Sequence, residues 1–260
     1  TQRSLKSALS QNFENYEVIV VDDCSTDKTE EVVGRWMKKY PNLRYIKNAE
    51  NKRCAGSKNV GIKAAQGEYI ACLDDDNELL PDFLKRTIYF FDVDNKNCIL
   101  NLGAVGIGKI IKYVKQDYEV YAPPPTSQQI ISMDWGWLFR REVFNHIQYD
   151  EQCWANDDTD FGIRFLQQKI KLLPKCLDNT RWMYFGINDP LAIAFDTEDD
   201  STSLSFPDEK EIAGMRYFLQ KNEQYYTDPN ERRYIYRLMG RKLYRGGYKN
   251  EGLKYMIKSF

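Results

Sequence analysis

The stretch Glu68–Asn77, EYIACLDDDN, sets both the expected fold class and the expected site. Its apolar run Tyr69–Leu73 ends on three consecutive carboxylates, Asp74, Asp75 and Asp76. A short apolar run of this kind is typical of a buried strand in a parallel sheet. Ligands of open α/β sheets bind outside the carboxyl ends of the strands. The sequence therefore predicts that these acids lie at the ligand-binding edge of a sheet.

Three adjacent carboxylates repel one another, and a bound cation relieves that repulsion. Carboxylate oxygens are hard ligands that favour Mg²⁺ or Mn²⁺. The alternative is a solvated acidic turn before a helix that Pro81 opens. The stretch by itself leaves both interpretations open.

The composition is that of a globular protein, with 260 residues, 42% of them hydrophobic and 29% charged. This length allows one large domain, or one domain with an extension. The formal net charge of −1 argues against a nucleic-acid-binding protein that works by overall charge. Six scattered cysteines without a C-x-x-C pair indicate reduced thiols and a cytoplasmic location. Without a signal peptide or a spanning apolar run, we expect any membrane contact to be peripheral, at the inner face.

Strand-like and helix-like segments alternate over the first 90 residues. Strands are expected at 17–21, 43–46 and 68–73, and helices at 1–11, 27–40, 55–66 and 82–91. This alternation predicts a parallel sheet with crossover helices. The carboxyl ends of parallel strands open on one edge, so the acids Asp22-Asp23 and Asp74–Asp76 can face one ligand.

The rest of the chain is less regular. Further elements are expected as strands at 98–102, 109–114, 136–140 and 170–173, a helix at 158–168, a stiff connector at Pro123–Pro125 and a loop at 196–203. From residue 208 onward, helix formers, tyrosines and basic residues predominate. We therefore predict a domain over 1–207 and a basic helical extension over 208–260. That extension could dock on an anionic membrane surface or a lipid-phosphate acceptor, or it could present an ordinary solvated helical face.

Two further acidic groups are candidate sites. Asp22 and Asp23 could accept hydrogen bonds from a nucleobase or a ribose, although helix capping is the alternative. Asn156–Asp160 leads a helix, where carboxylates are stabilised by the helix dipole. Three acids exceed what one cap needs, so one of them could be a general base for a hydroxyl nucleophile.

Two apparent signals are rejected. Gly103–Lys109 matches G-x-x-x-x-G-K, but Ile110 stands where a phosphate loop needs Ser or Thr, and the residues that follow favour a strand. The single histidine, His146, has no Cys or His partner nearby in the sequence and is interpreted as a surface or packed residue.

Taken together, these segments resemble the family 2 glycosyltransferases of the GT-A fold, in order and with suitable spacing over residues 1–174. The matching segments are Ser7-x-x-x-Gln11, Tyr16–Thr29, Lys58–Ile70, Leu73–Asp76, Leu138–Arg141, and Asp157–Asp160 with Arg164. The resemblance implies an α/β, Rossmann-like fold: a mostly parallel GT-A-type sheet flanked by helices, with a C-terminal helical extension.

The resemblance also implies a donor site. The donor would be a nucleotide diphosphate sugar, expected to be a UDP-sugar, with Asp23 binding the base. Asp74 and Asp75 would bind ribose and sugar, and Asp76 would bind the Mn²⁺ or Mg²⁺ on the diphosphate. Lys58 would serve a phosphate.

On the acceptor side, the resemblance implies an inverting transfer to a hydroxyl of a glycan or lipid-linked acceptor, as in polysaccharide biosynthesis. Asp158 would be the catalytic base, with Asp157 as the alternative. Trp135, Trp137 and Arg140 would frame the acceptor.

The sequence departs from the family pattern in four places. The family's first strand and nucleotide-binding turn are absent before the first helix, so we expect the natural chain to start earlier or that segment to be missing. The usual Glu-Asp pair is Asp157-Asp158, Lys58 stands where Arg is frequent, and no histidine follows the catalytic helix to complete a metal site. A sugar-nucleotidyltransferase-like enzyme and a catalytically silent sugar-nucleotide-binding module remain alternative functions.

Overall fold

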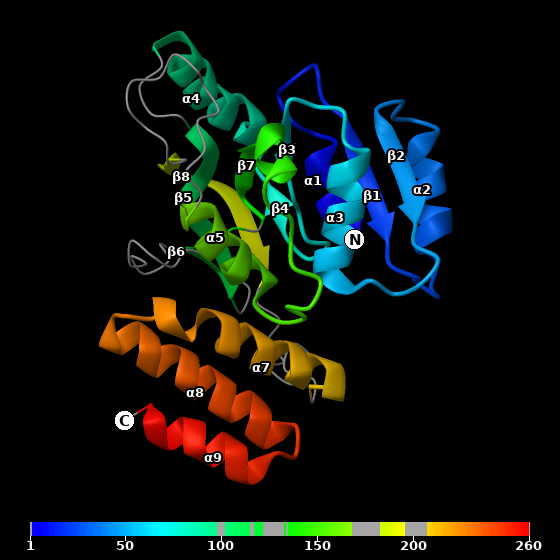
Figure 1. Cartoon of the computed structure of the whole chain (residues 1–260). Helices are drawn as coiled ribbons and strands as arrows, with labels where there is room; N and C mark the ends of the chain where they lie inside the picture. The colour runs from blue at the N-terminus through cyan, green and yellow to red at the C-terminus, as the bar shows by residue number, and fades with distance from the viewer. Residues whose placement is uncertain are drawn as a thin grey trace.

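The structure, a computed structural model, describes residues 2–97, 102–114, 117–121, 133, 135–167, 183–195 and 207–259. Strands and helices form an α/β body, and three further helices lie beneath it (Figure 1). The predicted α/β fold class, with helices flanking the sheet and a helical C-terminal extension, is confirmed. The domain boundary at 207/208 stays a prediction.

The first sheet consists of β1 (Val18–Asp22) and β2 (Leu43–Lys47), which pair in parallel. Helix α2 (Thr29–Met37) makes the crossover between them and buries Val33 completely. Helix α1 (Gln2–Ala8) contributes buried Leu5 to the same small core. The strand–helix–strand order expected from the sequence is therefore present here.

The second sheet has the strand order β3-β7-β5-β8-β4, and β6 pairs with β5. The strands are β3 (Tyr69–Ala71), β4 (Glu78–Leu79), β5 (Leu102–Val114), β6 (Asp117–Tyr121), β7 (Trp137–Arg140) and β8 (Met183–Phe195). The β5–β8 pair is parallel, whereas the β3–β7, β4–β8, β5–β6 and β5–β7 pairs are antiparallel. Strand β3 therefore enters this sheet through β7.

Strand β5 corrects one prediction and supports another. Residues 98–101 lie outside the described part of the chain, but Leu102–Val114 is one continuous strand where two were predicted. Gly106 of β5 pairs with Trp137 of β7. A Cβ at Gly106 would lie 2.5 Å from the Trp137 ring, so glycine is required for this close approach. Because Gly103–Lys109 lies inside a strand, the rejection of a phosphate loop holds.

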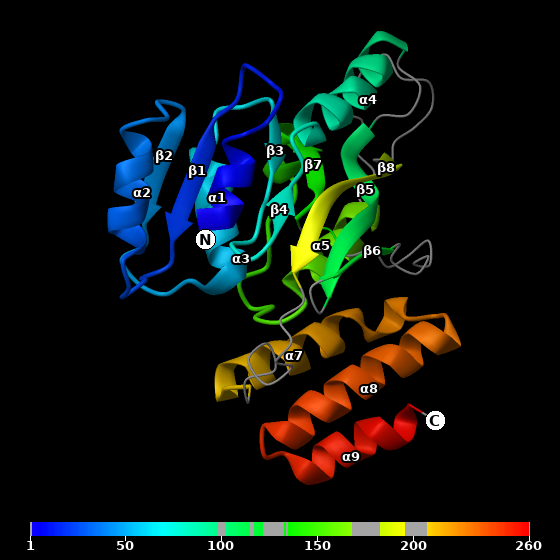
Figure 2. The same ribbon diagram turned by 180° about the vertical axis from the view of Figure 1, so that it is seen from behind.

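Helices cover both faces of the body. Helices α3 (Arg53–Ala64) and α5 (Asp157–Gln167) lie on one face, and α1 lies on the other (Figures 1 and 2). Helix α4 (Phe83–Asn97) packs on the second sheet. Beneath α5, the rings of Phe139 and Phe161 meet edge to face, with centroids 5.5 Å apart. This aromatic core fixes the position of α5 relative to β7.

A cavity of about 1200 Å³ separates β1 from β3, and both strands line it along their length. Its walls contain both aliphatic and polar side chains, and Asp23, Asp74 and Asp75 lie at the carboxyl ends of these strands. The further strand expected ahead of α1 stays a prediction.

The C-terminal helices are α7 (Glu209–Asn222), α8 (Pro229–Arg245) and α9 (Lys249–Lys258). Asp208 and Asp228 cap the first two, accepting backbone N–H bonds of 2.7 Å and 2.8 Å. Fully buried Met215 and Phe218 of α7 share a core with Ile163 of α5. No helix in the described parts of the chain is long and apolar enough to cross a membrane.

Some predictions cannot be compared with the structure. The connector at Pro123–Pro125, the strand at 170–173 and the loop at 196–203 lie outside the described residues. Strand β8 was not predicted at all.

Candidate active site

Asp23 follows β1 and is held by three donors. Its carboxylate accepts hydrogen bonds from Asn48 Nδ2 at 2.8 Å and from the backbone N–H groups of Lys52 and Arg53, both at 2.7 Å. Burial opposes the charged form, but these donors outweigh burial and lower the pKa of Asp23. The Ser57 side chain also lowers this pKa, so the charged carboxylate of Asp23 is held at the edge of the cavity.

The neighbouring Asp22 has a structural task. Its side chain is buried and accepts hydrogen bonds from the Tyr45 hydroxyl and, at 2.7 Å, from the backbone N–H of Ser25. Burial opposes ionisation, but these bonds lower the pKa of Asp22. Of the two acids that end β1, Asp23 is therefore the candidate ligand residue.

The loop that carries Asp74 and Asp76 is anchored by α1. Ser4 Oγ donates to the Asp74 carbonyl at 2.9 Å, and Arg3 Nη2 donates to the Asp76 carbonyl at 3.3 Å. The Asp76 carboxylate accepts a 2.9 Å bond from Asn77 Nδ2. Sequence analysis missed Arg3 and Ser4, because no local pattern links positions about 70 residues apart.

Lys58 joins the strand-end acids to the acids of α5. Its Nζ lies 3.3 Å from Asp157 Oδ2 and 5.0 Å from the centre of the Tyr149 ring. Both side chains of the Lys58–Asp157 pair are largely buried, with exposed fractions of 9% and 13%. Helices α3 and α5 thus bring together residues 99 positions apart.

The electrostatics of Asp74 show which charges surround it. Burial raises the pKa of Asp74; Lys58 opposes this shift, and the charges of Asp76, Asp157 and Asp158 add to it. We call Lys58, Asp74, Asp76, Asp157 and Asp158 the Lys58 cluster. The cluster contains one cation and four acids, so its net charge is strongly negative.

The first turn of α5 presents Asp157 and Asp158 differently. Burial raises the pKa of Asp157, although its carboxylate faces Lys58, which opposes the shift. Asp158 accepts a weak 3.4 Å bond from Thr159 Oγ1, and its backbone carbonyl accepts the Met133 N–H at 3.2 Å. Burial and the charge of Asp158 together raise the pKa of Tyr226. Asp158 therefore lies close to the C-terminal helices.

Three non-glycine residues of the described chain have left-handed backbone φ: Cys24 (67°), Arg53 (61°) and Asn156 (65°). Each is in contact with or next to a candidate acid, since Cys24 follows Asp23, Arg53 N–H binds Asp23, and Asn156 precedes Asp157. Such conformations are unfavourable for these residues and cluster at functional sites. The left-handed residues therefore lie in the same region as the candidate acids.

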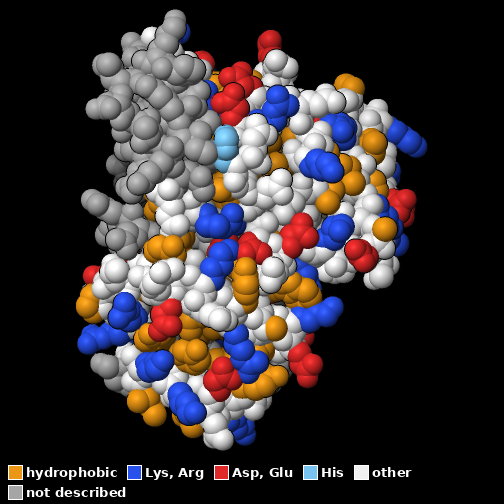
Figure 3. All heavy atoms as spheres, viewed as in Figure 1, with side chains coloured by type: hydrophobic (Ala, Val, Ile, Leu, Met, Phe, Trp, Pro, Cys, Tyr) orange, Lys and Arg blue, Asp and Glu red, His pale blue; other side chains and the backbone are white. Residues whose placement is uncertain are grey.

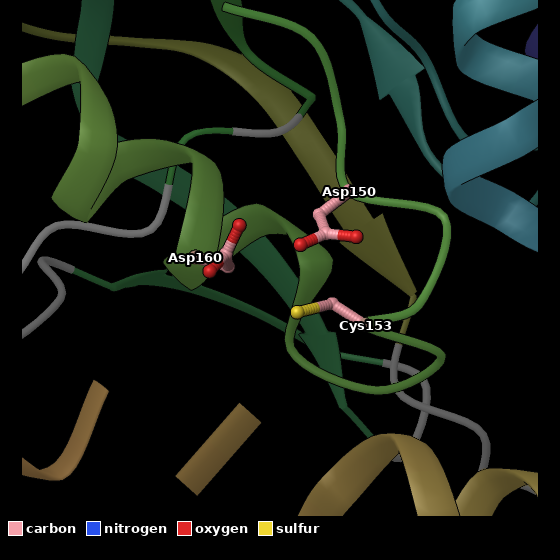
Figure 4. Close-up of side chains that lie close together, drawn as sticks. All are labelled: Asp150, Cys153 and Asp160. Carbon is pink, nitrogen blue, oxygen red and sulfur yellow. The ribbon is translucent and has the colours of Figure 1, made fainter. Parts of the chain in front are cut away.

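A second group of acids meets metal-ligand distances. Asp150, Cys153 and Asp160 place one ligand atom each within 4.8 Å of one another, and among the described residues this is the single such group (Figure 4). Yet Lys221 Nζ lies 2.7 Å from Asp150 Oδ2 and 2.8 Å from Asp160 Oδ1. Arg164 Nε lies 2.7 Å from Asp160 Oδ2. These cations of the protein already balance the two carboxylates, so a divalent ion would have to displace Lys221.

Asp74, Asp75 and Asp76 do not form such a three-ligand group in the described structure. This agrees with the way Mg²⁺ is usually bound, through one or two carboxylates together with substrate phosphates. The assignment of the metal to Asp76 stays a prediction.

The structure brings most predicted site residues together. Lys58, Asp74, Asp76 and the α5 acids form one electrostatic group, and Asp23, Lys58, Asp74 and Asp75 line one cavity. Arg140 is a correction. It is 5% exposed, hydrogen bonds to Asn95 and lies 5.0 Å from the centre of the Phe91 ring, so it packs against α4 and does not frame an open acceptor pocket.

Comparison with known families gives one match. The model of the family described as Glycosyl transferase family 2 matches residues 1–149, which include β1, α3, the Asp74–Asp76 loop and β7.

Two curated relatives show the same similarity. Succinoglycan biosynthesis protein ExoO of Rhizobium meliloti (strain 1021) is 43% identical over 86 residues, which cover 33% of this chain and 24% of that protein. UDP-Glc:alpha-D-GlcNAc-diphosphoundecaprenol beta-1,3-glucosyltransferase WfaP of Escherichia coli is 36% identical over 91 residues, 35% of this chain and 36% of that protein. The matched part thus spans about a third or less of these relatives.

Among solved structures, mannosyltransferase PcManGT from Pyrobaculum calidifontis, in complex with GDP-Man and Mn²⁺, has a TM-score of 0.60. The sequence identity is 15%, and the match covers 99% of this chain and 81% of that chain. At this identity the similarity concerns the fold alone.

Proposed function

Because the chain belongs to glycosyl transferase family 2, we propose that it is a metal-dependent, inverting glycosyltransferase that acts on a nucleotide diphosphate sugar. The observation that carries this proposal is the Lys58 cluster. Acids from the carboxyl end of β3 and from the first turn of α5 meet around one lysine. A donor bound by the first set would therefore lie within reach of a base from the second.

The donor half of the proposal assigns four residues. Asp23 binds the base, and Asp74 and Asp75 bind ribose and sugar. Lys58 contacts a phosphate. UDP is the expected nucleotide, because the name of WfaP specifies UDP-Glc; GDP is the competitor, because PcManGT was solved with GDP-Man.

The acids of the Lys58 cluster fit a divalent cation. Their carboxylate oxygens are hard ligands. Burial of Asp74 and the charges of the neighbouring acids raise the pKa of Asp74. A cation held by Asp76 would lower that repulsion. When bound, Mn²⁺ or Mg²⁺ would stabilise the negative charge that grows on the leaving diphosphate.

The acceptor half assigns the base to Asp158. Its carboxylate takes the proton of the acceptor hydroxyl as that oxygen bonds to the anomeric carbon. The bond from this carbon to the diphosphate oxygen breaks, and its electron pair leaves with the nucleoside diphosphate. Attack from the side opposite the leaving group inverts the anomeric carbon. Asp157, whose carboxylate pairs with Lys58 at 3.3 Å, is the alternative base.

The acceptor class follows from the relatives' names. ExoO is named for succinoglycan biosynthesis, and WfaP for a diphosphoundecaprenol-linked sugar. We therefore propose a glycan or lipid-linked acceptor, with transfer in the cytoplasm at the inner face of the membrane.

A thermal-shift screen tests the donor and the metal together. The panel is UDP-Glc, UDP-GlcNAc and GDP-Man, each with and without Mn²⁺. A ligand present at about 100 times its Kd stabilises the folded state by about 2.7 kcal/mol, which raises Tm by about 5–10 °C. We expect one donor to give this shift with Mn²⁺ and to release its nucleoside diphosphate slowly by hydrolysis. Shifts without hydrolysis would favour a silent binding module, and no shift with any donor would contradict the proposal.

A further inference from the structure

The exposed face of α9 is an apolar and cationic stripe. Exposed residues recur at positions i, i+1, i+4, i+5, i+8 and i+9, which form one side of a helix. They are Lys249, Asn250, Leu253, Lys254, Ile257 and Lys258. Leu253 and Ile257 are 46% and 70% exposed, which is unusual for two aliphatic side chains one turn apart.

Helix α8 exposes a row of four arginines. Arg233, Arg237, Arg241 and Arg245 follow one another at intervals of four residues, and all four are exposed. Like charges at this spacing destabilise a helix by about 0.2–0.5 kcal/mol per pair. In the described part of the chain, none of the four forms an ion pair. An external anionic surface would remove this repulsion.

Basic side chains that lie between the C-terminal helices are paired with acids. Lys242 pairs with Glu211 at 3.3 Å, and Arg216 of α7 pairs with Glu251 at 2.6 Å. Helices α8 and α9 contain nine Lys and Arg residues against two Glu, Glu231 and Glu251, and both acids are partly buried. The unbalanced positive charge is therefore confined to the outward faces.

The two helices form a tight pair that presents these faces together. A Cβ at Gly240 would lie 2.8 Å from the Gly252 carbonyl, and one at Gly252 would lie 2.7 Å from the Gly240 carbonyl. The backbones therefore cross in close contact. Helix α9 lies at the outer end of the molecule, farthest from the sheets (Figures 1 and 2), and basic and hydrophobic side chains are interspersed over this region (Figure 3).

We propose that the outward faces of α8 and α9 form a docking surface for an anionic lipid bilayer. The six α9 residues above and the four arginines of α8 make up this surface. Basic residues attract anionic headgroups, while Leu253 and Ile257 can enter the boundary between headgroups and acyl chains. A nucleic acid would use the arginines but has no apolar phase for the two aliphatic side chains. Docking would bring the body of the protein to the membrane that holds a lipid-linked acceptor.

Vesicle co-sedimentation of the whole chain tests the proposal. The probes are vesicles of phosphatidylcholine alone and vesicles with 30% phosphatidylglycerol, each at about 0.05 M and 0.5 M salt. We expect binding to the anionic vesicles that weakens at the higher salt. Each basic residue near the surface contributes about a fivefold change, so Arg237→Gln/Arg241→Gln should weaken binding about 30-fold. Leu253→Ser/Ile257→Ser should also weaken binding, because it removes the apolar contribution to binding, which salt does not screen.

Matched variants on α2 and next to it control for charge and apolar area. Lys38→Gln/Lys39→Gln removes the same charge from another exposed site, and Met37→Ser removes another exposed apolar side chain. All variants are compared by Tm, so that loss of fold is separated from loss of binding. The proposal is overturned by equal binding to both vesicle types or to none. It is also overturned if the α8 and α9 variants bind like the α2 controls, or if a short DNA duplex binds in place of vesicles.

Discussion

Two lysines of this protein each lie between acids, and their surroundings differ. Lys221 Nζ contacts two carboxylates, Asp150 and Asp160, at 2.7 Å and 2.8 Å. Lys58 Nζ lies 3.3 Å from Asp157 Oδ2, and the charges of Asp74, Asp76 and Asp158 act on the same region. We call Lys221, Asp150 and Asp160 the Lys221 cluster.

The pKa shifts of the two clusters have opposite signs. Burial opposes the charge of Asp150, but the Lys221 ammonium and other donors lower the pKa of that carboxyl. Burial likewise opposes the charge of Lys221, but both carboxylates raise its pKa. In the Lys58 cluster, burial and neighbouring acids raise the pKa of Asp74, and burial raises that of Asp157. The pKa of the Asp150 carboxyl is thus lowered, whereas the pKa values of Asp74 and Asp157 are raised. A cation bound at the Lys58 cluster, as proposed above, would oppose the shift of Asp74.

The comparison teaches where stability and function lie. A group of acids whose charges are balanced by hydrogen bonds and cations stabilises the fold. A group whose acids are held against their own repulsion is a candidate ligand site, because a ligand can supply the missing charge.

Replacement of Asp158 should give the largest effect. Asp158→Asn is nearly isosteric and cannot take a proton, so we expect turnover to fall by about 10²–10⁴-fold. Donor affinity should change little, because the base acts on the acceptor. Initial rates with a saturating donor measure the loss, and titration calorimetry measures the donor affinity.

Asp157→Asn is the matched control, since Asp157 is the neighbouring acid on the same helix turn. A larger loss in Asp157→Asn than in Asp158→Asn would mean that the base is Asp157. Normal turnover in both variants would contradict the proposed mechanism.

Replacement of Lys221 should give the largest effect on stability. Lys221→Met leaves two close carboxylates without their shared cation, and breaking a buried pair in this way destabilises a protein by about 3 kcal/mol. We expect Tm to fall by about 6–12 °C. Lys58→Met should lower Tm less, because burial already disfavours the charged forms of Asp74 and Asp157 and raises their pKa values. A greater loss of stability in Lys58→Met would reverse the comparison.

Replacement of Asp76 should remove the metal response. In Asp76→Ala the fold is kept, and the additional Tm increase that Mn²⁺ gives with a donor should disappear. Donor binding without metal should remain. The control is Glu14→Gln, which removes an exposed carboxylate elsewhere. If Asp76→Ala retains its Mn²⁺-dependent shift, the metal is held by other residues.

The sequence predicts strands β1 and β3 better than it predicts β5 and β8. Strands β1 and β3 are recognisable because each is a short apolar run followed by acids, and this pattern is local. Strand β8 was missed because its Asp189-Pro190 sequence is typical of a break, and Pro190 removes a backbone donor. Its partner β5 was predicted only in part, since glycines have low strand propensity. Gly106 is required there for close packing against Trp137.

Contacts that depend on distant parts of the chain could not be predicted. Lys221 reaches Asp150 and Asp160 from 71 and 61 positions away, and nothing near any of the three residues indicates a partner. The role expected for Arg140 was wrong for a related reason. The motif placed it near the acceptor, but successive side chains of a strand point to opposite faces, and Arg140 packs against α4.

Replacement of Asp74 should give the smallest effect, and it tests the difference between the Lys58 and Lys221 clusters most directly. Because the pKa of Asp74 is raised in the folded protein, the folded state binds more protons than the unfolded state above the ordinary Asp value of 3.8. The free energy of unfolding therefore falls as pH rises from 3.8 through the raised pKa, and this contribution is fully present only below 3.8. Asp74→Asn cannot ionise, so it should be more stable than the parent protein at pH 7.5. At about pH 4 the difference should vanish.

We expect a Tm increase of about 2–4 °C at pH 7.5, the shift that about 1 kcal/mol gives in a chain of this size. Thermal melts between pH 4 and pH 8 measure it. Asp23→Asn is the control with the opposite sign, because the pKa of Asp23 is lowered and its charge contributes stability that is present above 3.8 and lost as pH falls. Asp23→Asn should therefore be less stable than the parent at pH 7.5. If Asp74→Asn also loses stability there, the Asp74 charge is satisfied within the protein, and the Lys58 cluster does not differ from the Lys221 cluster.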